Sequence, residues 1–169
     1  MEKRDPGTNG RARDAAGLDL RALARTGPVH FVGISGAGVS ALAELVLRSG
    51  GRVTGCDLRS GPVVDALRAM GADVAEGHDP SHVAGAVAVV TTAAVPADHP
   101  ELAEARSRGI PVLKRAEALG ALVNRGTVVA VAGTHGKTTT TAMTTAILAE
   151  AGLNPTGFVG GRVPEGGGG

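Results

Sequence analysis

The chain has 169 residues, a formal net charge of +1 at pH 7 and a hydrophobic content of 43%. These values suffice for a packed core, which must be aliphatic because the chain lacks Trp and Tyr and contains only two Phe residues. The near-neutral charge provides no polybasic field, and so few aromatic rings cannot form a base-stacking surface. The composition therefore argues against nucleic acid and membrane surfaces as partners and favours a soluble protein that acts on small molecules.

The N-terminal segment and the cysteine content indicate the compartment. The first 20 residues are charged and rich in Gly, and they lack the apolar segment that a secretory signal requires. The single cysteine, Cys56, excludes an internal disulfide and is consistent with a reducing compartment. We expect a disordered extension over residues 1–26 and a cytoplasmic location. We expect Cys56 to be a small buried hydrophobe, with a reactive thiol as the alternative.

Apolar runs alternate with helical patterns between residues 28 and 123. Short apolar runs predict strands at residues 29–32, 52–56, 72–75, 86–90 and 110–113. Helical patterns are predicted at residues 39–48, 63–70, 100–108 and 115–123. This alternation predicts an α/β fold with a parallel sheet covered by helices on both faces, and a domain boundary near residues 124–126.

The apolar run at residues 127–132 predicts a further buried strand. A glycine-bearing turn follows this run. The turn consists of Gly133, Thr134, His135, Gly136, Lys137 and Thr138. A helix predicted from residue 138 to about residue 151 follows it, and the unpaired amides and dipole at a helix N-terminus attract anionic oxygen. The pattern predicts a nucleotide triphosphate site.

Four residues in and directly after this turn have expected roles in nucleotide binding. Lys137 can reach the β and γ phosphate oxygens, the Thr138 hydroxyl can bind Mg²⁺, and Thr139 can contact a phosphate. The His135 ring contacts ATP or a bound substrate, or it fills the turn. The strict P-loop pattern requires Gly where Val131 stands, so a glycine turn capped by Thr residues remains the alternative.

The first glycine-rich turn, at residues 33–38, raises the question of dinucleotide binding. Gly33, Gly36 and Gly38 precede a predicted helix, and Asp57 lies 19 residues after Gly38, a spacing that suits a ribose-binding acid. The dinucleotide fingerprint requires Gly where Ser35 stands. The turn binds a phosphate or diphosphate, or it is purely structural; Asp57 binds a ribose, or it caps the turn at residues 58–60.

The remaining histidines carry no predicted metal site. His78 and His82 lie four residues apart, but Pro80 between them argues against a helix that presents both to a metal. We interpret both as loop residues and His99, beside Pro100, as a surface residue.

Three segments together resemble the Mur ligases. They are residues 30–40 (HFVGISGAGVS), 53–57 (VTGCD) and 132–141 (AGTHGKTTTT). Residues 90–95, 98–101, 109–112 and 152–156 are also similar to that family, so the resemblance runs from about residue 28 to residue 161. It implies a Rossmann-like domain over residues 27–124 that holds the UDP part of the substrate. It also implies that residues 125–169 begin a central P-loop ATPase domain.

The resemblance further implies a reaction. ATP phosphorylates the carboxylate of UDP-N-acetylmuramate, and the amine of L-alanine attacks the acyl phosphate to form an amide in peptidoglycan synthesis. Lys137, Thr138 and His135 would be the catalytic residues, with ATP and Mg²⁺ as cofactors. The UDP diphosphate would face Gly33, Ser35, Gly36, Ala37 and Gly38, with Asp57 near the ribose or uracil.

Two departures from the family pattern matter. Ser35 stands where the family commonly has Gly, and the downstream elements of the family have no counterpart before residue 169. We therefore expect a chain that is inactive alone and whose residues 127–161 are less stable than residues 28–123. Two alternatives are a ligase that joins a murein tripeptide to UDP-N-acetylmuramate, and a non-catalytic NAD-binding regulatory module. The Gly-Ala-Gly turn favours the alanine ligase, and Lys137 and Thr138 have no role in the NAD module.

Overall fold

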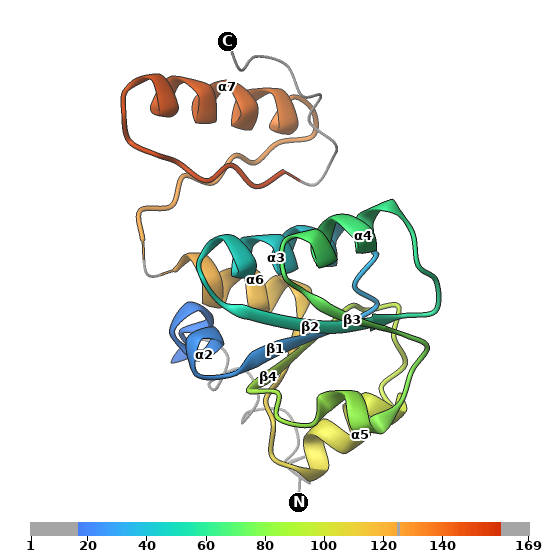
Figure 1. Cartoon of the computed structure of the whole chain (residues 1–169). Coiled ribbons are helices and arrows are strands. Elements are labelled where there is room, and N and C mark those ends of the chain that lie inside the picture. Colours follow the sequence, from blue (N-terminus) through green and yellow to red (C-terminus); the bar gives the residue numbers. More distant parts are fainter. Residues whose placement is uncertain (1–16, 125, 160–169) are drawn as a thin grey trace, which may run out of the picture. The chain divides into compact units, whose positions relative to one another are not determined.

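A parallel sheet with the strand order β3-β2-β1-β4-β5 forms the centre of the first part of the chain (Figure 1). The computed structural model describes residues 17–124 and 126–159. The strands are β1 (Pro28–Val32), β2 (Arg52–Asp57), β3 (Asp73–Glu76), β4 (Ala88–Thr91) and β5 (Val112–Lys114). The predicted parallel α/β fold is confirmed, and the chain divides into two compact units after Thr127.

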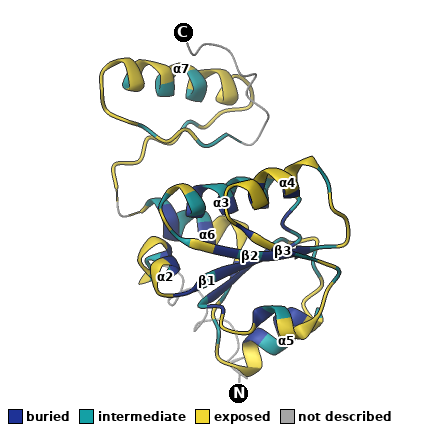
Figure 2. Ribbon diagram, in the orientation of Figure 1, coloured by how far each residue is buried: buried dark blue, intermediate teal, exposed yellow. Residues whose placement is uncertain are grey.

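Helices cover both faces of this sheet (Figure 1). One face carries α3 (Ala37–Arg48), α4 (Pro62–Ala69) and α6 (Arg115–Val123). The other face carries α5 (Pro100–Ser107), beside the 3-10 helix η1 (Pro80–Val83). Strands covered on both faces are mostly apolar, and β4 is buried along its whole length (Figure 2).

Helix α2 (Leu20–Thr26) corrects the expectation of disorder for the residues that precede the sheet. Its N-terminus is capped by Asp19, whose side chain accepts a hydrogen bond from the Ala22 amide at 3.0 Å. Leu20 and Ala24, four residues apart and therefore on one helix face, are fully buried. Residues 1–16 of the expected extension lie outside the described residues.

The sheet order places a topological switch between β1 and β4. Consecutive strands run one way from β1 to β3, and the chain then returns to place β4 on the other side of β1. In open α/β sheets, ligands bind at such a point, beyond the carboxyl ends of the strands. The glycine-rich turn follows β1 and Asp57 ends β2, so both predicted substrate-binding segments lie at this edge.

The second unit contains α7 (Lys137–Glu150), close to the predicted helix, but not the strand predicted before it. Residues 128–132 pair with no strand of the described chain, and Val128 and Val129 are 52% and 65% exposed. The prediction of a buried strand here is therefore wrong. Within the described residues, no helix combines the length and the apolar character that a membrane crossing requires.

Candidate functional site

The backbone of the turn after β1 is anchored on the end of β2. The amides of Gly33 and Ile34 both donate hydrogen bonds to the Cys56 carbonyl, at 2.9 and 3.1 Å. Gly33 has a φ of 71°, which favours glycine, and the Ile34 side chain is fully buried. Gly55 permits this close approach, since a Cβ there would lie 2.6 Å from Ile34 Cδ1. The turn is therefore held in one conformation by the strand beside it.

Ser35 and Asp57 interact directly. Asp57 Oδ2 accepts two hydrogen bonds from Ser35, one from its amide at 3.0 Å and one from its hydroxyl at 2.6 Å. Partial burial acts to raise the pKa of Asp57, but these hydrogen bonds and those from the amides of Arg59 and Leu58 outweigh it, so its pKa lies below the usual value. The carboxylate is thus ionised and holds the glycine turn through the Ser35 side chain that replaces the expected glycine.

The N-terminus of α3 follows immediately. The helix begins at Ala37 with Gly36 as its N-cap, so Gly38 lies in the first helical turn. The sequence analysis had placed Gly38 in the turn before the helix, which is wrong. The Ala37 and Gly38 amides fall among the first amides of the helix, which have no intrahelical acceptor. A phosphate group at this position would meet free N–H donors and the positive end of the helix dipole.

Arg115, the first residue of α6, was missed by the sequence analysis. A Cβ at Gly38 would lie 2.6 Å from an Arg115 guanidinium nitrogen, so the guanidinium lies against the first turn of α3. Gly38 therefore permits the approach of a cation to the helix N-terminus. The available signal was the position of a basic residue just after the predicted strand at residues 110–113, at the carboxyl edge of the sheet.

The second glycine turn, at residues 133–138, lies in the second unit. Gly136 is the N-cap of α7 and has a φ of 80°, and Gly133 has a φ of 153°. Lys137 Nζ donates to the carbonyls of Gly133 and Thr134, at 2.6 and 3.2 Å. The lysine side chain thus lies over its own turn, next to the first amides of the helix.

The hydroxyl-bearing residues of this turn are exposed. Thr138 and Thr139 belong to the first turn of α7, and His135 precedes it. All three side chains are open to solvent, and no side chain caps the helix. The structure thus assembles a turn able to receive an anion, while the individual roles of these residues stay predictions.

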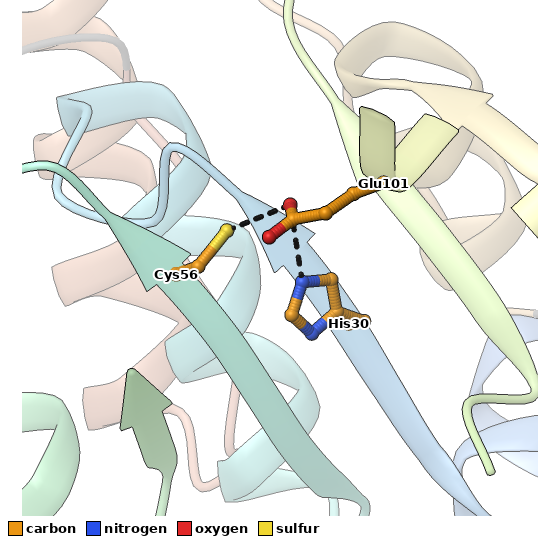
Figure 3. Close-up of side chains that lie close together, drawn as sticks. All are labelled: His30, Cys56 and Glu101. Atoms are coloured by element: carbon orange, nitrogen blue, oxygen red, sulfur yellow. Dashed lines mark hydrogen bonds and ion pairs between the residues drawn. The ribbon is translucent and has the colours of Figure 1, made fainter. Parts of the chain in front are cut away.

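A buried polar cluster lies on the face of the sheet that α5 covers (Figure 3). His30 on β1 and Glu101 on α5 are 1% and 0% exposed, and Cys56 on β2 is fully buried. Cys56 Sγ donates to Glu101 Oε2 at 2.9 Å, and His30 Nε2 lies 3.7 Å from the same oxygen. Cys56 is buried as predicted, but its partners are polar.

Two further histidines contact Glu101. His82 Nδ1 lies 2.8 Å from Glu101 Oε1, and His78 Nδ1 lies 3.3 Å from Cys56 Sγ and 3.7 Å from Glu101 Oε2. His82 was predicted to lie in a loop, but it lies in the 3-10 helix η1. His99, predicted at the surface, is half-buried, and its ring meets that of His78 edge-on with centroids 4.5 Å apart.

The cluster shifts the ionisation of its members. Burial, together with the hydrogen bond to Glu101, raises the pKa of the Cys56 thiol far above its usual range. Burial also acts to raise the pKa of Glu101, but the approach of His30 and the hydrogen bonds from Cys56 and His82 outweigh it and lower the pKa to about 2. The interior therefore holds an ionised carboxylate and a neutral thiol.

Comparisons with known proteins identify relatives of the chain. Residues 28–127 match the family described as "Mur ligase family, catalytic domain". The UDP-N-acetylmuramate–L-alanine ligase of Methylibium petroleiphilum is 50% identical over 139 residues, which are 82% of this chain and 30% of the relative. The ligase of the same name from Roseiflexus sp. is 49% identical over 136 residues, which are 80% of this chain and 29% of the relative. The chain thus spans about three tenths of the length of these relatives.

Solved structures show the same likeness. A UDP-N-acetylmuramate–alanine ligase from Thermotoga maritima superposes with a TM-score of 0.72 at 34% identity, over 81% of this chain and 32% of that one. A UDP-N-acetylmuramate:L-alanyl-γ-D-glutamyl-meso-diaminopimelate ligase from Neisseria meningitides superposes with a TM-score of 0.73 at 31% identity. That match covers 84% of this chain and 45% of the other.

Proposed function

The chain belongs to the Mur ligase family, and on that premise we propose that it is the N-terminal part of an ATP-dependent ligase that joins L-alanine to UDP-N-acetylmuramate. The relatives at 47–50% identity that carry the alanine ligase name support this substrate pair. The reaction belongs to peptidoglycan synthesis, in the cytoplasm. Because the chain spans three tenths of these relatives, the complete reaction requires further residues.

The observation that carries the proposal is the diphosphate cradle at the topological switch. The turn at residues 33–36 and the N-terminus of α3 present backbone amides at the edge where open α/β sheets bind ligands. The Arg115 guanidinium lies against the same helix turn and would supply charge-assisted hydrogen bonds to the UDP diphosphate. Asp57 would act as a positioning residue, because its Oδ2 already holds Ser35 and orders the turn.

The residues around Lys137 would bind ATP in the complete enzyme. Bound ATP supplies the phosphoryl group that activates the muramate carboxylate toward the amine of L-alanine. Lys137 would leave the two carbonyls it now contacts and bind the phosphates, while the amides of the first turn of α7 contact their oxygens. Thr138 would hold Mg²⁺ through its hydroxyl, and His135 and Thr139 would line the nucleotide.

A ligase for a murein tripeptide is the second candidate, since the similar Neisseria meningitides protein is a ligase for L-alanyl-γ-D-glutamyl-meso-diaminopimelate. The sugar nucleotide would be the same in both reactions, so the cradle at residues 33–38 does not discriminate between them. The named alanine ligases at about half identity favour L-alanine as the amine. An NAD-binding module would leave Lys137 and Thr138 without a role.

Calorimetric titration of the chain with UDP-N-acetylmuramate, and with NAD in parallel, tests the proposal. We expect binding of the sugar nucleotide and none of NAD. Arg115→Ala should weaken that binding about tenfold, the loss of one charge-assisted hydrogen bond, while Arg108→Ala, at the C-cap of α5, should leave it unchanged. Binding of NAD alone, or an equal loss from both arginine variants, would overturn the assignment.

The chain alone should form no amide from UDP-N-acetylmuramate, ATP and L-alanine. The second unit presents an exposed turn and helix, with no residue of α7 buried. Phosphate release and amide formation measured on the isolated chain should both stay at the level of a buffer control. Steady amide formation would contradict the proposal that further residues complete the site.

A further inference from the structure

We propose that His30, Cys56 and Glu101, completed by His78, form a binding site for Zn²⁺ in the interior of the first unit. The three buried ligand atoms all lie within 4.8 Å of one another (Figure 3). Imidazole, thiolate and carboxylate are the ligands that Zn²⁺ binds in proteins. The ligand side chains are not those of the diphosphate cradle, whose turn is bonded to the backbone carbonyl of Cys56, and the site does not depend on the proposed ligase reaction.

Four of the six separations between the proposed ligand atoms are close to those around a tetrahedral ion. Zinc–ligand bonds of about 2.0–2.3 Å at tetrahedral angles place neighbouring ligand atoms about 3.3–3.6 Å apart. The measured values are 2.9 Å for Cys56 Sγ to Glu101 Oε2 and 3.3 Å for Cys56 Sγ to His78 Nδ1. Glu101 Oε2 lies 3.7 Å from both His30 Nε2 and His78 Nδ1. Of these four separations, the contact between Cys56 and Glu101 must lengthen most for an ion to be seated between the ligand atoms.

His30 supplies the independent observation that points to a ligand. Its Nε2 atom is buried and has no hydrogen-bond partner within the described residues, although it is directed at Glu101. Buried polar atoms are normally paired, because an unmet hydrogen bond costs about 1–3 kcal/mol. The other ring nitrogen, Nδ1, lies 3.0 Å from Thr54 Oγ1, so it can donate to that hydroxyl when a bound ion takes the Nε2 lone pair.

The two oxygens of Glu101 have different surroundings. Oε1 accepts a hydrogen bond from the Asp79 amide at 3.1 Å and lies 2.8 Å from His82 Nδ1, so it is held by groups that are not proposed ligands. Oε2 faces Cys56, His30 and His78. This division is typical of a carboxylate that binds a metal through one oxygen and is oriented through the other.

The site has a route of entry and a balanced exchange of charge. The His78 and His82 side chains are 24% and 22% exposed, so the cluster reaches solvent on the side of the loop before η1. A divalent ion that binds Cys56 displaces the thiol proton, which leaves to solvent, and the resulting thiolate and the Glu101 carboxylate balance the two positive charges. The ion would join β1, β2 and α5, elements far apart in sequence.

Cobalt spectroscopy of the 169-residue chain tests this proposal. Cys56 is the only cysteine, so a thiolate-to-cobalt charge-transfer band on addition of Co²⁺ would by itself identify it as a ligand, without any variant. We expect that band, intense visible bands of a tetrahedral ion, one metal per chain by native mass spectrometry, and displacement of Co²⁺ by Zn²⁺. Absence of the charge-transfer band would overturn the proposal.

Three variants separate the site from adventitious binding. Cys56→Ser and His30→Asn should each weaken Zn²⁺ binding by more than about 100-fold, measured by competition with a chromogenic chelator. His135→Asn removes an exposed imidazole outside the cluster and should leave the affinity unchanged. Circular dichroism checks that each variant is folded. An affinity that is unchanged in the first two variants, or that falls only in the third, would contradict the site.

Discussion

Two apolar runs of the chain look alike in sequence and differ in structure. Residues 86–90 contribute β4, which pairs with β1 on one side and β5 on the other, and Val89 and Val90 are fully buried. Residues 127–132 form no strand, and Val128 and Val129 are more than half exposed. An apolar run is therefore a strand only where neighbouring strands satisfy its backbone, a condition that the run itself does not encode.

The helices of the two units show the same contrast. Helix α3 buries five apolar side chains: Val39, Leu42, Ala43, Leu45 and Val46. Helix α7 buries none, and its Met143 and Ile147 are 61% and 64% exposed. Since most of a helix's stability in a protein comes from burying one face, α3 is stabilised by its unit far more than α7 is.

Matched leucine substitutions should give the largest difference between the two units. Leu42→Ala removes a fully buried side chain of α3 and should lower the free energy of unfolding by about 2–5 kcal/mol. Leu153→Ala removes a side chain that is 67% exposed and should change it by less than about 0.5 kcal/mol. Urea unfolding followed by circular dichroism measures both, and similar losses would break the comparison.

A smaller effect on stability is expected from Gly55→Ala. The new Cβ would meet Ile34 Cδ1 at 2.6 Å and the Phe31 carbonyl oxygen at 2.9 Å, so the turn after β1 must shift, at a cost of about 1–3 kcal/mol. Gly61→Ala is the control, because its Cβ would meet nothing within 4 Å. Thermal unfolding should separate the two variants; equal midpoints would show that the turn is not held by this packing.

Ser35→Ala should affect ligand binding more than folding. It removes the 2.6 Å hydrogen bond from the hydroxyl to Asp57 and leaves the amide bond, so the turn loses part of its anchor. We expect about tenfold weaker binding of UDP-N-acetylmuramate by calorimetry, the range of a hydrogen bond to a charged group. Ser49→Ala, at the opposite end of α3, should bind as the unchanged chain does. Equal affinities for both variants would remove Asp57 from the positioning role.

Lys137→Ala should change the stability of the chain least. Its ammonium group contacts only carbonyls of its own exposed turn, so the free energy of unfolding should move by less than about 0.5 kcal/mol. Binding of ATP with Mg²⁺ should fall, whereas Lys114→Ala, the same charge change in the first unit, should leave it unaltered. A marked loss of stability in Lys137→Ala would mean that the turn of the second unit supports the fold.

Much of the first unit could be predicted from the sequence, because each strand run is followed by a helix pattern that supplies its cover. The range at residues 115–123 matches α6, and the start of α3 was misplaced by two residues because Gly36, not Gly38, is the N-cap. Helix α2 was missed although four of its seven residues are Leu or Ala, because the charged, Gly-rich segment before it led to residues 1–26 being assigned to one disordered extension. Local patterns do not reveal which distant element will cover them.

The candidate site was only partly predictable for the same reason. Gly33 and Asp57 could be read from spacing, but the Ser35–Asp57 hydrogen bonds and the approach of Arg115 to Gly38 depend on how three strand ends meet. The cluster around Glu101 combines residues from β1, β2 and α5. No sequence spacing relates them, since parallel strands bring together residues far apart in the chain.

Hydrogen exchange of the isolated chain, read by mass spectrometry at peptide resolution, tests the central difference between the two units. We predict that amides of β1, β2 and β4 exchange only through global unfolding, while those of residues 128–132 exchange nearly as fast as in an unfolded peptide. Helix α7 should be intermediate, because it has helical hydrogen bonds but no buried face. Uniform protection across both units would contradict this account.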